Sequence, residues 1–168
     1  MVSAAVLVPI VARPQGLTVL LTQRTEQLKQ HSGQISFPGG RTDPGDPSPE
    51  FTALREAREE VGLAAERVEV LARLADYLVR TGFRVTPVVG LVTPPFDLAP
   101  DPREVADVFE VPLAFLLDPA NHRRETRELN GRTVGFYVVD YGARRIWGAT
   151  AGMLVNLYRQ LAAAPPGG

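Results

Sequence analysis

The segment that most constrains this chain spans residues 39–63 and ends in a dense run of charged side chains. Ser48 and Pro49 stand before that run, and Gly62 follows it. Serine is a favoured N-cap, proline fits the first helical turn, and glycine commonly ends a helix. The pattern therefore predicts a helix that begins after Ser48 and stops at Gly62.

Three glutamates share one face of this predicted helix. Glu56, Glu59 and Glu60 are spaced i, i+3 and i+4, which places their carboxylates side by side. One interpretation is a solvated acidic face, because charge runs usually lie at the surface. The other is a site for a hard divalent cation, whose preferred ligands are carboxylate oxygens and whose charge would remove the repulsion. The opposite, buried stripe is expected to comprise Phe51, Leu54, Ala57 and Val61.

The residues before the helix favour the second interpretation. A Phe-Pro-Gly-Gly sequence ends at Gly40. The adjacent glycines Gly39 and Gly40 allow positive φ and close backbone approach, which a loop that accommodates phosphate requires. Upstream, Arg24 and Lys29 add positive charge beside this turn, and positive charge suits a phosphate-rich ligand.

Residues 40–63 resemble the Nudix box, in which a glycine is followed at a distance by an Arg-Glu-x-x-Glu-Glu-x-Gly helix. In the family pattern the sixth residue after the glycine is a glutamate, and seven residues separate it from the arginine. Here Asp46 stands at that place, and eight residues separate it from Arg55. The metal-binding half of the motif is intact.

A second signature covers residues 20–40 and resembles the coenzyme A pyrophosphatase branch of the same family. That signature reads Leu-Leu-Thr-x-Arg and a small residue, followed at fixed spacing by Arg, Gly and Phe-Pro-Gly-Gly. Arg24 is in register with it, and two positions depart from it. Thr25 stands where Ser or Ala is usual, and Lys29 stands where Arg is usual. Lysine keeps the charge but lacks the planar, two-pronged contact of arginine.

The resemblance implies an α/β protein with the α/β/α sandwich and mixed β-sheet of Nudix proteins. It also implies Mg²⁺ or Mn²⁺ as cofactor, bound by Glu56, Glu59 and Glu60, with Glu59 a ligand or the general base. Arg55 would orient the glutamates. Glu104, in an Arg-Glu-Val sequence after the central strands, is a candidate for metal binding or proton transfer. The alternative for Glu104 is an ordinary surface glutamate.

The activity implied by the resemblance is metal-dependent hydrolysis of the pyrophosphate bond of coenzyme A or a derivative. The products would be 3′,5′-ADP and 4′-phosphopantetheine or its acylated form. Arg24 or Lys29 would contact the 3′-phosphate, and Gly39 and Gly40 would lie beside the diphosphate. Two alternatives stay open. One is a Nudix pyrophosphatase acting on ADP-ribose, dinucleotides or nucleoside triphosphates, and the other is a Nudix-fold nucleotide-binding module without turnover.

Composition bounds these functions. With 168 residues, 45% of them hydrophobic, the chain is expected to form a single domain, residues 1–168, with its core at about 4–162. A net charge of −1 gives no general attraction for nucleic acid, so a small-molecule substrate is the expected partner. The absence of cysteine excludes disulfides, thiolate nucleophiles and cysteine-bound zinc. No apolar run reaches membrane-spanning length and no secretory signal is evident, which predicts a cytoplasmic protein without a membrane partner.

Patterns of β-branched and apolar residues predict most of the strands. Residues 4–12 and 17–23 form an expected hairpin, and Pro87 is expected at a sheet edge or a bulge. A second hairpin is expected around the Asn130-Gly131 turn. The final helix is expected to open within residues 146–151. The remaining predicted strands are residues 68–72, 76–80, 83–92, 123–129 and 133–141.

Overall fold

The structure, a computed structural model, describes residues 1–26 and 33–164. The chain divides into two compact units, Met1–Leu113 and Ala114–Gly168, and the expectation of a single domain stays a prediction. Within the described part of the chain, no helix is long and apolar enough to cross a membrane.

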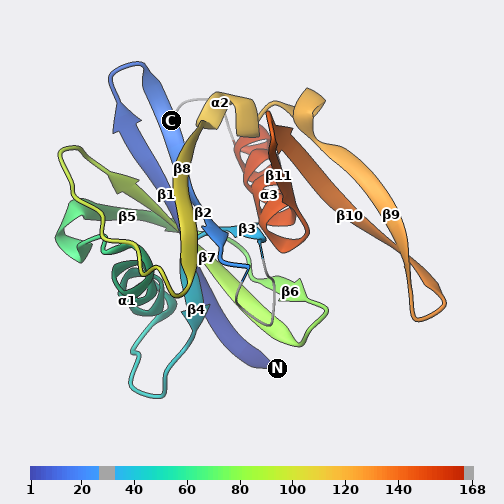
Figure 1. Cartoon of the computed structure of the whole chain (residues 1–168), viewed down its shortest axis with the longest axis horizontal. Coiled ribbons are helices and arrows are strands. Elements are labelled where there is room, and N and C mark those ends of the chain that lie inside the picture. The colour runs from blue at the N-terminus through green and yellow to red at the C-terminus, as the bar shows by residue number, and fades with distance from the viewer. Residues whose placement is uncertain (27–32, 165–168) are drawn as a thin grey trace. The chain divides into compact units, whose positions relative to one another are not determined.

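A mixed β-sheet forms the framework of the first unit (Figure 1). Among the described residues it contains eight strands, and its main path runs β3-β2-β1-β7-β5. Strands β1 and β7 are parallel, whereas the other pairs are antiparallel. The mixed sheet predicted from the sequence is therefore present. Its strands are β1 (Val2–Arg13), β2 (Gly16–Arg24), β3 (Ile35–Ser36), β4 (Gly39–Arg41), β5 (Val68–Arg73), β6 (Tyr77–Val79), β7 (Phe83–Val92) and β8 (Val105–Pro112).

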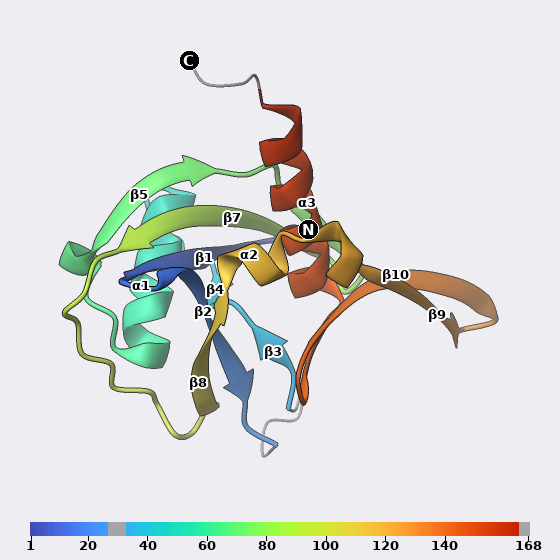
Figure 2. The same ribbon diagram turned by 90° about the horizontal axis from the view of Figure 1, so that it is seen from above.

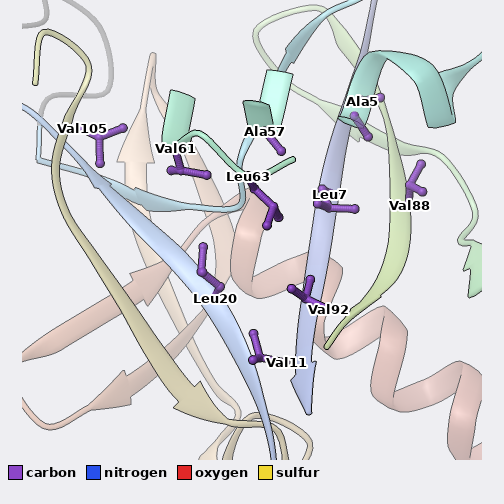
Figure 3. Packing of buried hydrophobic residues seen from close by; sticks show 11 residues of the cluster. Ala5, Leu7, Val11, Leu20, Ala57, Val61, Leu63, Val88, Val92 and Val105 are labelled. Atoms are coloured by element: carbon purple, nitrogen blue, oxygen red, sulfur yellow. The ribbon is translucent and has the colours of Figure 1, made fainter. Parts of the chain in front are cut away.

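The core of the first unit lies between this sheet and helix α1 (Pro49–Val61) (Figures 1 and 2). Strand β1 is central and almost continuously apolar, as expected for a strand that is covered on both faces. Figure 3 shows its side chains converging with those of β7 and α1. Labelled members of this cluster include Leu7, Val11, Ala57, Val61 and Val88.

Helix α1 begins and ends where the sequence predicted. The Ser48 side chain accepts a hydrogen bond from the Phe51 amide at 3.2 Å, and Gly62 ends the helix in the left-handed region at φ 72°. The predicted buried stripe is wrong at Phe51, which is 47% exposed because it lies in the first turn and away from the sheet. The buried face instead consists of Thr52, Ala53, Ala57 and Val61.

Pro87 does not lie on an edge strand, because β7 has partners on both sides. It pairs with Val6 of β1, and its carbonyl accepts the Leu74 amide at 2.9 Å. The N and C=O of one strand residue point to the same side, so the missing N–H of Pro87 faces the stretch between β5 and β6. The proline is accommodated where one neighbouring strand ends and the next begins.

The second unit contains a three-stranded antiparallel sheet of β9 (Arg123–Leu129), β10 (Arg132–Tyr141) and β11 (Arg144–Trp147). Helix α3 (Ala149–Ala163) packs against β10 and β11. The predicted hairpin turn is confirmed, with positive φ at Asn130 and Gly131. The last helix opens within residues 146–151, as expected, at Ala149 after Gly148, whereas Ile146 and Trp147 belong to β11.

Three short helical segments complete the described chain. One is α2 (Leu113–Leu116) and two are 3₁₀ turns. The first of these turns, Ala65–Arg67, leads into β5, and the second, Pro119–Asn121, precedes β9.

Substitution of Gly62 by alanine is expected to destabilise the protein by about 1–2 kcal/mol, because φ is positive there. An added Cβ would also lie 2.7 Å from the Ala99 amide nitrogen. Gly45→Ala is the matched control, since no atom lies within 4 Å of its added Cβ and its φ is not positive. Urea unfolding of both variants checks this, and equal stabilities would contradict it.

Candidate active site

Arg55 is the centre of the hydrogen-bond network on α1. Its Nε and Nη2 donate to the two oxygens of Asp46 at 3.2 and 2.8 Å. Its Nη1 donates to Glu56 at 3.0 Å and to Glu59 at 3.3 Å, and Nη2 also reaches the Arg41 carbonyl at 3.0 Å. All five guanidinium N–H groups therefore have acceptors.

Asp46 is a functional candidate whose role the sequence did not reveal. Its side chain is only 3% exposed, and it accepts further hydrogen bonds from the Thr52 hydroxyl and the Asp43 amide. Hydrogen bonds from Arg55 are the main reason that the pKa of Asp46 falls to about 2. The carboxylate stays ionised and fixes the guanidinium in one orientation. The signal available in the sequence was its place six residues after Gly40.

Gly39 and Gly40 lie in β4 and not in a loop, and neither has positive φ, so that part of the prediction is wrong. The expected close approach is confirmed. A Cβ on Gly40 would lie 2.5 Å from Cδ of Glu56, and a Cβ on Gly39 would lie 2.5 Å from the Ala5 carbonyl oxygen. The Gly39 amide also donates to the Glu60 carboxylate. The glycine pair thus allows α1 to bring its carboxylates against the strand.

Glu60 lies in an environment that disfavours its charge. Burial, followed by the nearby negative charges of Glu56 and Glu104, raises the pKa of Glu60 to about 8. Burial also raises the pKa of Glu56, although Arg55 opposes the shift. Glu104 acts on both carboxyls, so the structure brings this predicted residue to the α1 glutamates.

The loop between β7 and β8 explains why Glu104 lies there. The amides of Ala99 and Asp101 donate to the carbonyls of Val61 and Glu60, at 2.7 and 2.8 Å. These carbonyls belong to the last turn of α1 and have no partner within the helix. The Thr25 amide in turn donates to the Glu104 carbonyl at 3.0 Å, which joins the end of β2 to the same loop.

Arg24 ends β2 on the side of this carboxylate group, and its charge lowers the pKa of Glu60 against the larger upward effects. Its Nε is buried and has no hydrogen-bond partner among the described residues. A buried, unpaired guanidinium nitrogen is costly, which indicates an acceptor other than the described residues. Lys29 lies outside the described residues.

The carboxylate oxygens suit a hard divalent cation, and burial together with the charges of Glu56 and Glu104 raises the pKa of Glu60. Within residues 1–26 and 33–164, however, no three Asp, Glu, His or Cys side chains are grouped closely enough to hold a metal ion. Glu59 is 57% exposed and turned toward Arg55. Joint binding by Glu56, Glu59 and Glu60 would require Glu59 to rotate away from Arg55.

Comparison with known proteins identifies the family. Residues 1–130 match the NUDIX domain family. The chain belongs to the Nudix family. It is 42% identical over 158 residues to an uncharacterized Nudix hydrolase, NudL, of Photorhabdus laumondii, covering 94% of this chain and 84% of the relative.

Solved Nudix structures share the fold. RenU, a Nudix hydrolase from M. smegmatis, is similar with a TM-score of 0.65 and 22% identity, covering 99% of this chain and 89% of that one. The NUDIX domain of Shewanella oneidensis NrtR, solved with ADP ribose, has a TM-score of 0.52 and 26% identity, covering 70% of this chain and 76% of that one. The predicted Nudix fold, an α/β sandwich with a mixed sheet, is confirmed.

The Nudix carboxylate group makes stability depend on pH in the absence of metal. The pKa of Glu60 is about 8 in the folded chain, against an ordinary value of 4.5. The folded state therefore holds the proton more tightly, and its contribution to stability is lost as pH rises from about 4.5 through 8. With EDTA present, the melting temperature is expected to fall across this window, and Glu60→Gln is expected to flatten the fall.

Glu59→Gln is the matched control, since its exposed carboxylate lies one residue away and the slope should persist. Differential scanning calorimetry at several pH values measures both variants. An unchanged slope in Glu60→Gln would show that Glu60 is not the group responsible.

Proposed function

We propose that this Nudix protein hydrolyses the pyrophosphate bond of coenzyme A or its derivatives, with Mg²⁺ or Mn²⁺, to 3′,5′-ADP and 4′-phosphopantetheine or its acylated form. The observation that carries the proposal is the meeting of two sequence signatures at one place. The carboxylates of Glu56, Glu60 and Glu104 influence one another electrostatically, and Arg24 of the upstream signature lies beside them with an unpaired Nε.

The reaction requires water to attack one phosphorus while the bond from that phosphorus to the bridging oxygen breaks. The bridging oxygen leaves with its electron pair on the other phosphate, and the water proton passes to a carboxylate. Bound Mg²⁺ or Mn²⁺ supplies two things, a lowered pKa for water and positive charge against the diphosphate. Glu56 and Glu60 are the proposed ligands, and Glu59 is a ligand or the general base.

Other residues orient or surround the α1 glutamates. Arg55 holds Glu56 and Glu59 and is itself fixed by Asp46, so it acts as a positioning residue. Glu104 lies near the same carboxyls and forms no ion pair with an arginine among the described residues, which supports a role in binding metal or accepting the proton. Gly39 and Gly40 keep the strand close to Glu60 and Glu56.

A second candidate is a Nudix activity on ADP-ribose or another nucleotide, which the ADP ribose complex of the NrtR domain favours. The upstream signature disfavours it, because that signature is specific to the coenzyme A branch. The test is product analysis by mass spectrometry with coenzyme A, acetyl-coenzyme A, ADP-ribose, NADH and a nucleoside triphosphate. Preferential, chelator-sensitive release of 3′,5′-ADP supports the proposal, and cleavage of another substrate instead overturns its coenzyme A assignment.

Glu56→Gln and Glu60→Gln are each expected to lower turnover by roughly 10² or more, because both remove a proposed metal ligand while keeping side-chain size. Glu69→Gln, on the exposed strand β5, is the matched control and should keep full activity. Initial rates with saturating Mg²⁺ measure the turnover of each variant, and circular dichroism checks that each variant is folded. Full activity in either helix variant would remove the proposed metal site, and no cleavage of any substrate with any metal would favour a binding module without turnover.

Arg24→Ala and Lys29→Ala are expected to reduce the preference for coenzyme A over dephospho-coenzyme A, since loss of a charged contact to the 3′-phosphate affects only the first substrate. The measurement is the ratio of kcat/KM for the two substrates. Arg67→Ala, an exposed arginine before β5, serves as the control. An unchanged ratio in both variants would refute this assignment of the 3′-phosphate contact.

A further inference from the structure

Two guanidinium groups of the second unit lie against one tyrosine ring. The Cζ of Arg124, on β9, is 4.7 Å from the centroid of the Tyr137 ring, and that of Arg159, on α3, is 5.7 Å away. The Arg159 Nη2 donates to the Tyr137 hydroxyl at 2.8 Å. Tyr137 on β10 is the cross-strand partner of Arg124 on β9, so both side chains project from the same face of the sheet. The two strands lie side by side in Figure 1.

A glycine makes room for the first of these arginines. Gly135 lies two residues before Tyr137 on β10 and therefore faces the same side. A Cβ added there would overlap Nη2 of Arg124 and lie 3.4 Å from its Cζ. The absence of a side chain lets the guanidinium rest against the strand next to the tyrosine ring.

The two arginines also lack the acidic partners found on the opposite face. There, Arg123 and Arg145 each lie 2.7 Å from the Glu125 carboxylate. In the described part of the chain, no Asp or Glu forms an ion pair with Arg124 or Arg159. Along α3, Arg159 is the only charged residue. Among the described residues, these two positive charges therefore lie at one tyrosine without a carboxylate to neutralise them.

Such an arrangement has the chemistry of an oxyanion site. Guanidinium groups bind phosphate through parallel N–H···O bonds, and a dianion offsets two like charges that otherwise repel. A phosphate group has three terminal oxygens, enough for two arginines and the tyrosine hydroxyl. We propose that Arg124, Arg159 and Tyr137 form a binding site for a phosphate monoester on the second unit. Hydrogen bonds from Arg124 and then Arg159 lower the pKa of Tyr137, in keeping with the positive charge around its hydroxyl.

The experiment uses the full-length, metal-free protein in EDTA, so it does not depend on the proposed hydrolase activity. The arginine side-chain Nε–H resonances of ¹⁵N-labelled protein are followed during titration with inorganic phosphate at constant ionic strength. The Arg124 and Arg159 signals are expected to shift and saturate with phosphate but not with acetate. The nucleotide 5′-AMP should bind at the same place, and adenosine should not.

Arg124→Gln and Arg159→Gln are each expected to weaken phosphate binding by roughly tenfold. Arg145→Gln removes the same charge from the opposite face and should leave the affinity unchanged. Unchanged affinity in both variants, or an equal loss in Arg145→Gln, overturns the proposal. If a glutamine variant does not fold, Arg124→Lys gives the same test, since lysine keeps the charge without the planar fork. Weaker binding then supports the site, and unchanged binding overturns it.

Discussion

The arrangement of the candidate active site depends on one guanidinium group. Arg55 uses all of its donors within the protein, and its acceptors include carboxylates of both the strand–helix connection and α1 itself. Without that charge, Glu56 and Glu59 would repel each other on one helix face. Asp46 completes the arrangement, because its buried carboxylate fixes Arg55 from the opposite side. The orientation of the α1 carboxylates therefore depends on Asp46, a residue that precedes the helix.

Backbone hydrogen bonds connect the end of α1 to other segments of the first unit. Gly62 ends α1 in the left-handed region, and the loop between β7 and β8 donates the amides of Ala99 and Asp101 to carbonyls in the last turn of the helix. That loop delivers Glu104 to Glu60, and Thr25 binds the same loop from the end of β2. The end of α1, the loop between β7 and β8 and the end of β2 are thus joined by backbone hydrogen bonds, and these bonds place Glu104 near Glu60.

The sequence predicted what is local. Ser48 and Gly62 set the limits of α1 through interactions within a few residues, and strand patterns located β1, β2 and β7 closely. It failed where packing between elements decides. Phe51 has the spacing of a core residue but is exposed. Its neighbour Thr52 is buried instead, and the Thr52 hydroxyl donates a hydrogen bond to Asp46. Pro87 lies in a central strand because the neighbouring strand is interrupted beside it, which no local pattern encodes. The substrate-side roles of Arg24 and Lys29 stay predictions.

Arg55 and Arg24 lie near the same carboxylates, but they differ in the hydrogen bonds that they make. A diphosphate and the carboxylates of Glu56, Glu60 and Glu104 have the same sign, so a substrate can approach only where positive charge is available. Arg55 cannot provide it, since its N–H groups are all engaged by protein acceptors. Arg24 retains a buried Nε without an acceptor in the described chain, close enough to Glu60 to influence its ionisation. Burial and the neighbouring carboxylates therefore disfavour the charge of Glu60, and the proposed contact of Arg24 with the substrate would use the Nε that no described residue binds.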